Sequence, residues 1–146
     1  MLKKLILFTM IVIGTAAVIV GGDVFFHVKE SSAAVMEHPA YITIGGGYYS
    51  TSLTELDLSN MDLRNEDIAS LRYMTNLTVL FLSNNQISNI TPLSTLTNLT
   101  ELSLSSIQIS DITPLSTLMN LDWLFLYNNQ IRDWGPVRHV AQVAGR

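Results

Sequence analysis

Glu55 and Asp57 are separated by one residue within a predicted strand, and a pair of carboxylates is the simplest acid–base apparatus a protein can carry. At ~3.3 Å per residue, side chains at i and i+2 of a strand lie on one side, roughly 6.5–7 Å apart. That separation is compatible with glycoside hydrolysis, in which two carboxyl groups flank the scissile bond. The surface is open and wet, however, and offers neither carboxylate the enclosed setting of an acid catalyst, so an enzyme with an unrecognised site is only a minor alternative.

Other residues whose side chains could act in catalysis or bind a metal are scattered rather than clustered. The three histidines, His27, His38 and His139, have no carboxylate or second histidine at ligand spacing. The serines lie outside any G-x-S-x-G pattern, and the segment IGGGYYS (residues 44–50) lacks the Lys-Ser/Thr of a phosphate loop. We therefore predict a non-enzymatic protein without metal or cofactor, and a tight turn between two strands at the glycines.

Composition narrows the classes of partner. The chain of 146 residues contains no cysteine, which excludes disulfides and thiolate chemistry. Beyond Gly22 it carries six basic and twelve acidic residues, whereas nucleic-acid binding requires basic clusters. We therefore expect no nucleic-acid partner.

The N-terminal segment 1–22 has the layout of an export signal. Lys3 and Lys4 precede an apolar run from Leu5 to Gly22, long enough at ~1.5 Å per residue to cross most of a ~30 Å hydrocarbon core as a helix. We predict a signal peptide or an uncleaved membrane anchor at 1–22, and an extracytoplasmic location that is either secreted or membrane-anchored. Residues 23–40 then form a spacer, and residues 41–52 form a lead-in to the following segment.

An internal repeat governs the rest of the chain. ISNITPLSTL at 87–96 returns as ISDITPLSTL at 109–118, with nine of ten letters unchanged. Frames of equal length begin at Leu77, Leu99 and Leu121, and an earlier frame, longer by two residues, begins at Leu53. Such a period predicts a solenoid of about four repeats over 53–146.

Each frame predicts one coil of the solenoid. It opens with LxxLxL, whose alternation indicates a short strand with one buried face. Leucines spaced by three then follow Pro92, Pro114 or Pro136, which favours a single 3₁₀ turn with proline at its start. A coil cannot bury its own leucines, so stacked copies must share one core and align their strands in a parallel sheet.

The pattern LxxLxLxxNxIxxIxPLxxLxN resembles the leucine-rich repeat, in the 22-residue form of the bacterial internalin-like proteins. The resemblance implies a short right-handed α/β solenoid, with the parallel sheet on its concave face and 3₁₀ turns on its convex face, after an N-terminal hydrophobic helix. It places Asn85 and Asn129 on the structural asparagine ladder, where Met61 and Ile107 stand in the other two frames. A backbone shift, a water or a nearby serine must then compensate at those two positions.

In this family the outward side chains of the strands form the binding surface. Carried over by position, the predicted protein-binding residues are Glu55, Asp57, Val79, Phe81, Glu101, Ser103, Trp123, Phe125 and Tyr127. Trp and Tyr are typical of binding hot spots. The alternative is that the aromatic side chains pack on a cap, a tail or a second molecule.

We therefore expect an exported module that binds another protein, or a surface glycan, through its concave face. The alternative is a structural spacer or a truncated fragment of a larger surface protein, with self-association through the C-terminal coil. Three N-x-T triplets begin at Asn76, Asn89 and Asn98, and the first and third stand at a repeat position that is usually structural.

Overall fold

The computed structural model describes residues 19–20, 23–24 and 39–146. The predicted N-terminal hydrophobic helix lies outside the described residues, except at β1 (Ile19–Val20), which is a strand paired antiparallel with β2 (Asp23–Val24). The leader therefore stays a prediction. In the described part of the chain, no helix has the length and apolarity needed to span a bilayer.

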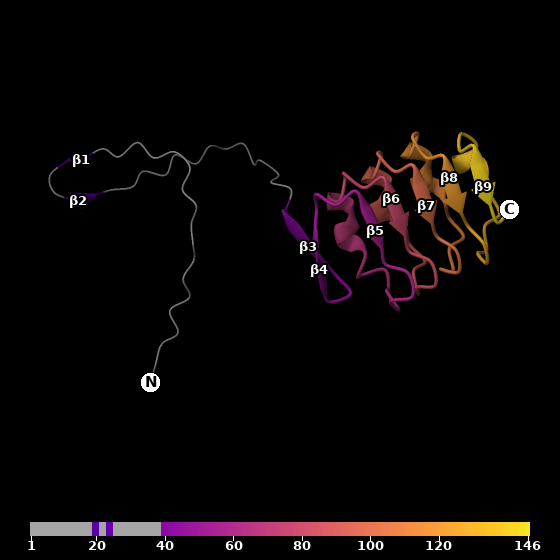
Figure 1. The fold of residues 1–146 in the computed structure, drawn as a ribbon, viewed down its shortest axis with the longest axis horizontal. Helices are drawn as coiled ribbons and strands as arrows, with labels where there is room; N and C mark the ends of the chain where they lie inside the picture. Colours follow the sequence, from indigo (N-terminus) through magenta and orange to yellow (C-terminus); the bar gives the residue numbers. More distant parts are fainter. Residues whose placement is uncertain (1–18, 21–22, 25–38) are drawn as a thin grey trace. The chain divides into compact units, whose positions relative to one another are not determined.

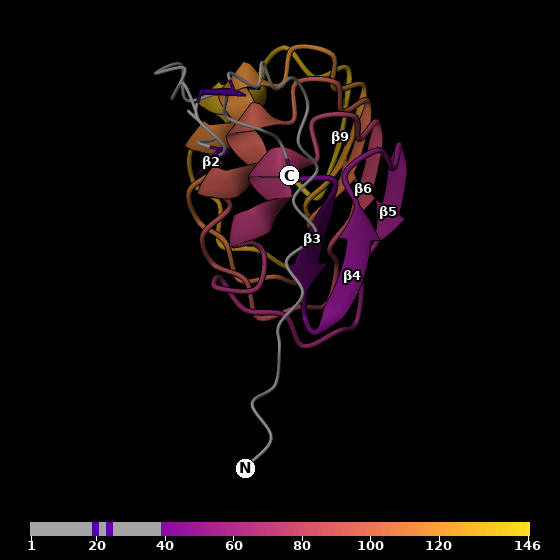
Figure 2. The ribbon, with the colours of Figure 1, turned by 90° about the vertical axis from the view of Figure 1, so that its left-hand side faces the viewer.

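A β-hairpin covers the N-terminal end of the repeats (Figures 1 and 2). β3 (Tyr41–Ile44) pairs antiparallel with β4 (Gly47–Ser50), and Ile42 and Ile44 on its inner side are buried. The predicted tight turn is confirmed, because Gly45 and Gly46 adopt φ values of 53° and 82°, which suit a two-residue hairpin loop. A Cβ on Gly45 would also come within 2.5 Å of Leu63 Cδ2, so glycine lets the turn pack closely on the first repeat.

The repeats form the predicted coil of parallel strands and 3₁₀ turns. The strands pair in chain order: β5 (Glu55–Asp57), β6 (Val79–Phe81), β7 (Glu101–Ser103), β8 (Trp123–Phe125) and β9 (Gln142–Ala144). The 3₁₀ turns are η1 (Ala69–Tyr73), η2 (Thr91–Thr95), η3 (Thr113–Thr117) and η4 (Gly135–Val137). Proline stands in the first turn of the last three, as predicted. Figure 2 looks from the hairpin end, with the 3₁₀ turns on the left and the strands on the right.

The core is a continuous stack of equivalent leucines. Leu80, Leu102 and Leu124 lie opposite one another in the strand register, and each is 0% exposed. Because burial of one such side chain is worth about 1.5–3 kcal/mol, one coil alone buries too little to order its backbone. Stacking supplies the missing burial, which is why the repeats must share one core.

The strand β9 was not predicted. The repeat period would place the equivalent of Trp123 at Gly145, but in the structure Gln142 already pairs with Trp123. The segment QVA lacks the LxL pattern, and only Val143 points into the stack, partly buried. Below it, the Arg146 guanidinium lies 5.7 Å from the centroid of the Trp134 ring.

The asparagine ladder is confirmed at Asn85 and Asn129. We call the four coils that begin at Leu53, Leu77, Leu99 and Leu121 the first to fourth rungs. Asn85 Oδ1 accepts hydrogen bonds from the backbone N–H groups of Met61 and Leu63 in the rung before it. Its Nδ2 donates to the Leu58 and Leu82 carbonyls.

Asn129 makes the equivalent connection from the fourth rung to the third. Its Oδ1 accepts from Ile109 N, and its Nδ2 donates to the carbonyls of Leu104 and Leu126. In both places the backbone also joins the two corners, through Gln86 N to Leu63 O and Gln130 N to Ile109 O.

Where asparagine is missing, the backbone is different. Asn84 and Asn128, just before the ladder asparagines, are the only residues with positive φ in their corners. The corners with Met61 and Ile107 contain a second one each, Asp62 (53°) and Gln108 (68°). A change of backbone conformation thus accompanies the missing asparagine in both rungs, and Ile107 itself is fully buried.

The opposite corner of the coil, just before each strand, is uniform. Asn76, Asn98 and Asn120 each donate from Nδ2 to a backbone carbonyl 23 to 25 residues earlier, those of Thr51, Thr75 and Thr97. The structural interpretation of Asn76 and Asn98 is therefore confirmed. This second ladder joins the segment before Leu53 to the first rung, the first rung to the second, and the second rung to the third.

Candidate functional site

The outer face of the five-stranded sheet, which we call the sheet face, gathers the predicted binding residues in two rows. The strand register aligns them across neighbouring strands. One row is Glu55, Val79, Glu101, Trp123 and Gln142, and the other is Asp57, Phe81, Ser103, Phe125 and Ala144. Tyr127 lies two residues beyond Phe125, and alternation along the strand puts it on the same side. All nine predicted residues therefore lie on one surface.

Aromatic side chains dominate the part of this face built by the fourth rung. Trp123 is 51% exposed and Tyr127 is 52% exposed, while Phe125 between them is partly buried. Phe81 is also partly buried, and one intervening strand, which carries Ser103, separates it from Phe125. Trp123 lies beside Gln142 of β9, and both Trp123 and Tyr127 keep about half of their surface exposed.

The other end of the sheet face is acidic. Glu55 and Asp57 are exposed on the first strand, and Glu101 is partly exposed on the third. Among the residues of strands β5 to β9, none is basic. The Asp57 carboxylate accepts a hydrogen bond from Ser59 N at 2.9 Å, which fixes the loop after the first strand.

Two serines connect the second and third rungs on the sheet face. The Ser83 and Ser103 hydroxyls are 2.7 Å apart and share a hydrogen bond. Because one hydroxyl donates and the other accepts, this contact orders both side chains on the sheet face. The aromatic residues of the fourth rung therefore stand beside a fixed, polar surface.

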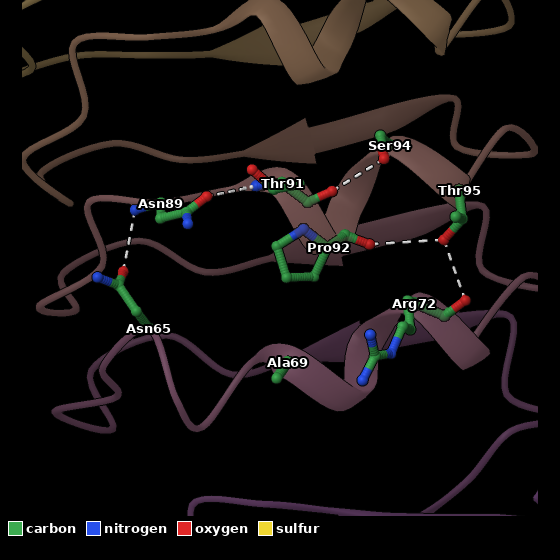
Figure 3. Close-up of a pocket in the computed structure, with 8 residues that line it drawn as sticks. All are labelled: Asn65, Ala69, Arg72, Asn89, Thr91, Pro92, Ser94 and Thr95. Carbon is green, nitrogen blue, oxygen red and sulfur yellow. Dashed lines mark hydrogen bonds between the residues drawn. The ribbon is translucent and has the colours of Figure 1, made fainter.

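Sequence reasoning missed a groove on the opposite wall, between η1 and η2 (Figure 3). Its volume is about 370 Å³, and it is lined by Asn65, Ala69, Arg72, Asn89, Thr91, Pro92, Ser94 and Thr95. In Figure 3 the Arg72 side chain extends along the groove beneath Pro92. The two extra residues of the first frame were the available signal, because they displace the start of the first 3₁₀ turn.

Two polar side chains of this groove, Asn65 and Thr95, hold the rungs together. Asn65 Oδ1 accepts from Ser88 N and Asn89 N, and Thr95 Oγ1 donates to Arg72 O. The loop at 64–67 therefore joins the first rung to the second. Arg72 is the one charged lining residue, and its guanidinium lies 5.2 Å from the Tyr73 ring centroid.

The described residues contain no group of three His, Cys, Asp or Glu side chains placed to hold a metal ion. His139 Nε2 lies 3.0 Å from the Leu118 carbonyl, so that side chain connects two rungs. His27 and His38 lie outside the described residues. The pKa of Asp111 is lowered by the Thr113 hydroxyl and then by the Thr113 N–H, which donates to Asp111 Oδ1 at the start of η3.

The coil of short parallel strands and 3₁₀ turns defines a leucine-rich repeat solenoid. The family model for leucine-rich repeats in two copies matches residues 51–95 and 75–117. A solved internalin, InlF of Listeria monocytogenes, is similar over 68% of this chain at 30% identity, with a TM-score of 0.61. Internalin C2 of the same organism is similar over 70% of the chain at 33% identity, with a TM-score of 0.50. The chain is a bacterial internalin-like leucine-rich repeat protein.

The chain spans only part of these relatives, 31% of the InlF chain and 54% of the internalin C2 chain. A search of the curated proteins found no match. Proteins of this family are in general modules that bind other proteins, and they are typically not enzymes.

Proposed function

We propose that this protein is an exported recognition module that binds another protein through the sheet face. The observation that carries the proposal is the exposure of Trp123 and Tyr127 on either side of Phe125, on a surface already held in place by the core. Aromatic side chains supply large contact area at low conformational cost and are enriched in binding hot spots.

The charge of the sheet face specifies the partner further. Glu55 and Asp57 lie on the first strand, at the end of the face away from the aromatic cluster of Trp123, Phe125 and Tyr127, whereas Glu101 lies directly beside Trp123. A partner that places an apolar segment on the aromatic cluster and basic side chains over the carboxylates would match both ends. Since such charges mainly steer encounter, Glu55→Gln with Asp57→Asn should slow association and weaken its salt dependence.

The experiment is site-specific photo-crosslinking of the full chain. A photoreactive residue in place of Ser103 should capture the partner, and one in place of Ser116, exposed on the opposite wall, should not. In the Ser103 background, Trp123→Ala and Tyr127→Ala should abolish capture while the melting temperature stays nearly constant, since both side chains are half exposed.

Met119→Ala is the matched control, because Met119 is 67% exposed outside the sheet face. Equal loss of capture in Met119→Ala, or a large fall in melting temperature in Trp123→Ala, would reject the proposed site. A surface glycan in place of a protein would show itself as capture that survives protease treatment.

The alternative, a spacer or a fragment that self-associates through the C-terminal coil, predicts a different result. It requires a dimer in solution that substitutions at Val143, on β9, dissociate. Sedimentation of the full chain distinguishes the two, since the recognition module is expected to be a monomer before it meets its partner. Export through residues 1–22 is tested separately, by locating the chain in cell fractions with and without Lys3 and Lys4.

A further inference from the structure

The outer side of the N-terminal hairpin is a second exposed aromatic surface, separate from the sheet face. Strand pairing sets Tyr41 opposite Ser50 and Thr43 opposite Tyr48, and these four residues share the side away from the core. We call them the tyrosine face. Tyr48 is 83% exposed and Tyr41 is 66% exposed, more than either Trp123 or Tyr127.

The tyrosine face rests on a rigid base. Ile42 and Ile44 on the inner side are 5% and 0% exposed. Thr51 closes the open end of the hairpin, where its N–H donates to Ala40 O and its hydroxyl to Pro39 O. The two rings are thus held on a framework that does not have to be ordered when a ligand binds, which lowers the entropic cost of binding.

The chemistry around these rings is neutral and rich in hydroxyl groups. Residues 39–54 contain no charged side chain, and Thr43, Ser52 and Thr54 are exposed. No hydrogen bond occupies the side chain of Tyr41 or Tyr48 among the described residues. The sheet face, by contrast, carries three carboxylates. An ionic ligand would find no opposite charge on the tyrosine face, so the surface fits an uncharged one.

The size of the surface favours a slender ligand over a folded protein. Two tyrosines can bury about 300–500 Å² together, whereas each partner in a stable protein complex buries ~800 Å². A sugar chain needs much less area, because the apolar C–H face of each sugar packs on an aromatic ring while its hydroxyls bond to polar neighbours. Tyr41 and Tyr48 lie on diagonal positions of the hairpin, at a Cα separation of ~7–8 Å, which places the two rings for successive sugar units.

We propose that the tyrosine face binds an uncharged polysaccharide. It does so independently of the protein bound at the sheet face, so the module attaches to a sugar-rich surface by its hairpin while the sheet face stays open. The affinity of one such site is low, and a repeating polymer compensates by offering many equivalent positions.

The test is affinity electrophoresis of the full chain in gels that contain a soluble β-glucan, a mannan or chitin oligosaccharides. At least one of these probes should retard the protein, and added salt should not change the retardation. Tyr41→Ser and Tyr48→Ser should each weaken binding about two- to tenfold, as expected for the loss of one aromatic contact. Tyr48→Phe, which keeps the ring, should retain most of the binding.

Trp123→Ala is the matched control, since it removes an exposed ring from the sheet face and should leave the retardation unchanged. The proposal is overturned if none of the three probes retards the protein, or if Trp123→Ala removes the retardation while the tyrosine variants keep it. It is equally overturned if the tyrosine variants lose capture of a protein partner and still bind sugar. Failure of the sheet-face proposal would leave the predicted retardation untouched, so the two are separable.

Discussion

Two junctions within the same stack are built differently. Asn85 makes four hydrogen bonds at the corner after its strand, of which three cross from the second rung to the first. Between the second and third rungs, Ile107 takes the equivalent position, and none of those bonds has a counterpart among the described residues. The sheet and the opposite corner continue across both junctions, through Leu82 N to Ser103 O and Asn98 Nδ2 to Thr75 O.

The comparison shows that the repeat has two solutions at one position. Each net hydrogen bond is worth ~1 kcal/mol, and burial of one isoleucine about 1.5–3 kcal/mol, so either choice supports the coil. The two junctions differ in local stability. Asn85 accepts a hydrogen bond from Leu63 N, whereas the equivalent N–H in the second rung, that of Ile87, has no asparagine to bind. The stack is therefore tied in two pairs of rungs, with a looser corner between them.

The largest effect is expected from Asn85→Ala. Removal of a buried side chain with four hydrogen bonds leaves buried backbone groups unpaired, and should lower the free energy of unfolding by about 3–4 kcal/mol. Asn129→Ala should cost about half as much, because Asn129 is only partly buried. Urea denaturation measures both.

Asn98→Ala is the control for this comparison, since its single bond to Thr75 O lies at an exposed corner. A loss below about 1 kcal/mol is expected. If Asn85→Ala and Asn98→Ala cost the same, the ladder corner has no special weight and the comparison fails.

Ile107 allows the looser corner to be rebuilt. Ile107→Ala should cost about 2–4 kcal/mol by leaving a cavity. Ile107→Asn also loses apolar burial but regains the ladder bonds, so it should be at least about 2 kcal/mol more stable than Ile107→Ala.

Hydrogen exchange reports the same corner directly. In the unmodified protein, the Ile87 amide should exchange faster than those of Leu63 and Ile109, whose N–H groups donate to ladder asparagines. Ile107→Asn should slow Ile87 alone. If Ile107→Asn has no higher free energy of unfolding than Ile107→Ala, and the Ile87 amide stays unprotected, the corner cannot accept the ladder geometry.

A smaller gain is expected from Gln108→Gly. Gln108 holds a φ of 68°, which costs a side chain other than glycine about 1–2 kcal/mol. Glycine removes that cost but loses chain entropy, so the free energy of unfolding should rise by about 0.5–1 kcal/mol. Gln86→Gly, at the equivalent position of a laddered corner without positive φ, should be destabilising by a similar amount. The same sign for both variants would contradict the backbone account.

The smallest effect is expected at Asp111, which lies at the start of a 3₁₀ turn and not at a ladder corner. Its pKa is lowered in the folded state, so its stabilising contribution is present above the ordinary carboxyl pKa and is lost as the pH falls through the lowered value. Asp111→Asn should leave the melting temperature unchanged at neutral pH, because Asn89 makes the same bond to Thr91 N one rung earlier. In acid, the variant should retain more of its stability than the unmodified protein, and thermal melts across pH measure this.

The sequence predicts those features that every rung must repeat. Leucine spacing placed the strands and the 3₁₀ turns, and Asn85 and Asn129 stood where the ladder needs them. Features that occur in only one rung could not be predicted from the repeat pattern. β9 comes earlier than the period requires and has one apolar residue where the pattern has two leucines, so no period marks it.

The same limit applies to local backbone and surface features. Asn65 stands in the only frame with extra residues, so nothing in the other frames indicates that it bonds to Ser88 and Asn89. The positive φ of Gln108 goes with the absence of an asparagine at the neighbouring position, Ile107, and the type of residue 108 does not reveal it. The register of the hairpin, and not its composition, sets the tyrosine face. The exposure of its rings follows from the burial of Ile42 and Ile44 on the opposite side of the hairpin.

The near-identity of the segments at 87–96 and 109–118 has a consequence for how the molecule could be shortened. Excision of residues 87–108 would join Gln86 directly to Ile109 and leave every remaining repeat in phase. The product would carry Asn85 and Asn129 on consecutive coils, with Ile107 gone, so one uninterrupted ladder would run between them. It would also bring Phe81 and Phe125 onto adjacent strands, and merge two separate aromatic contacts into one.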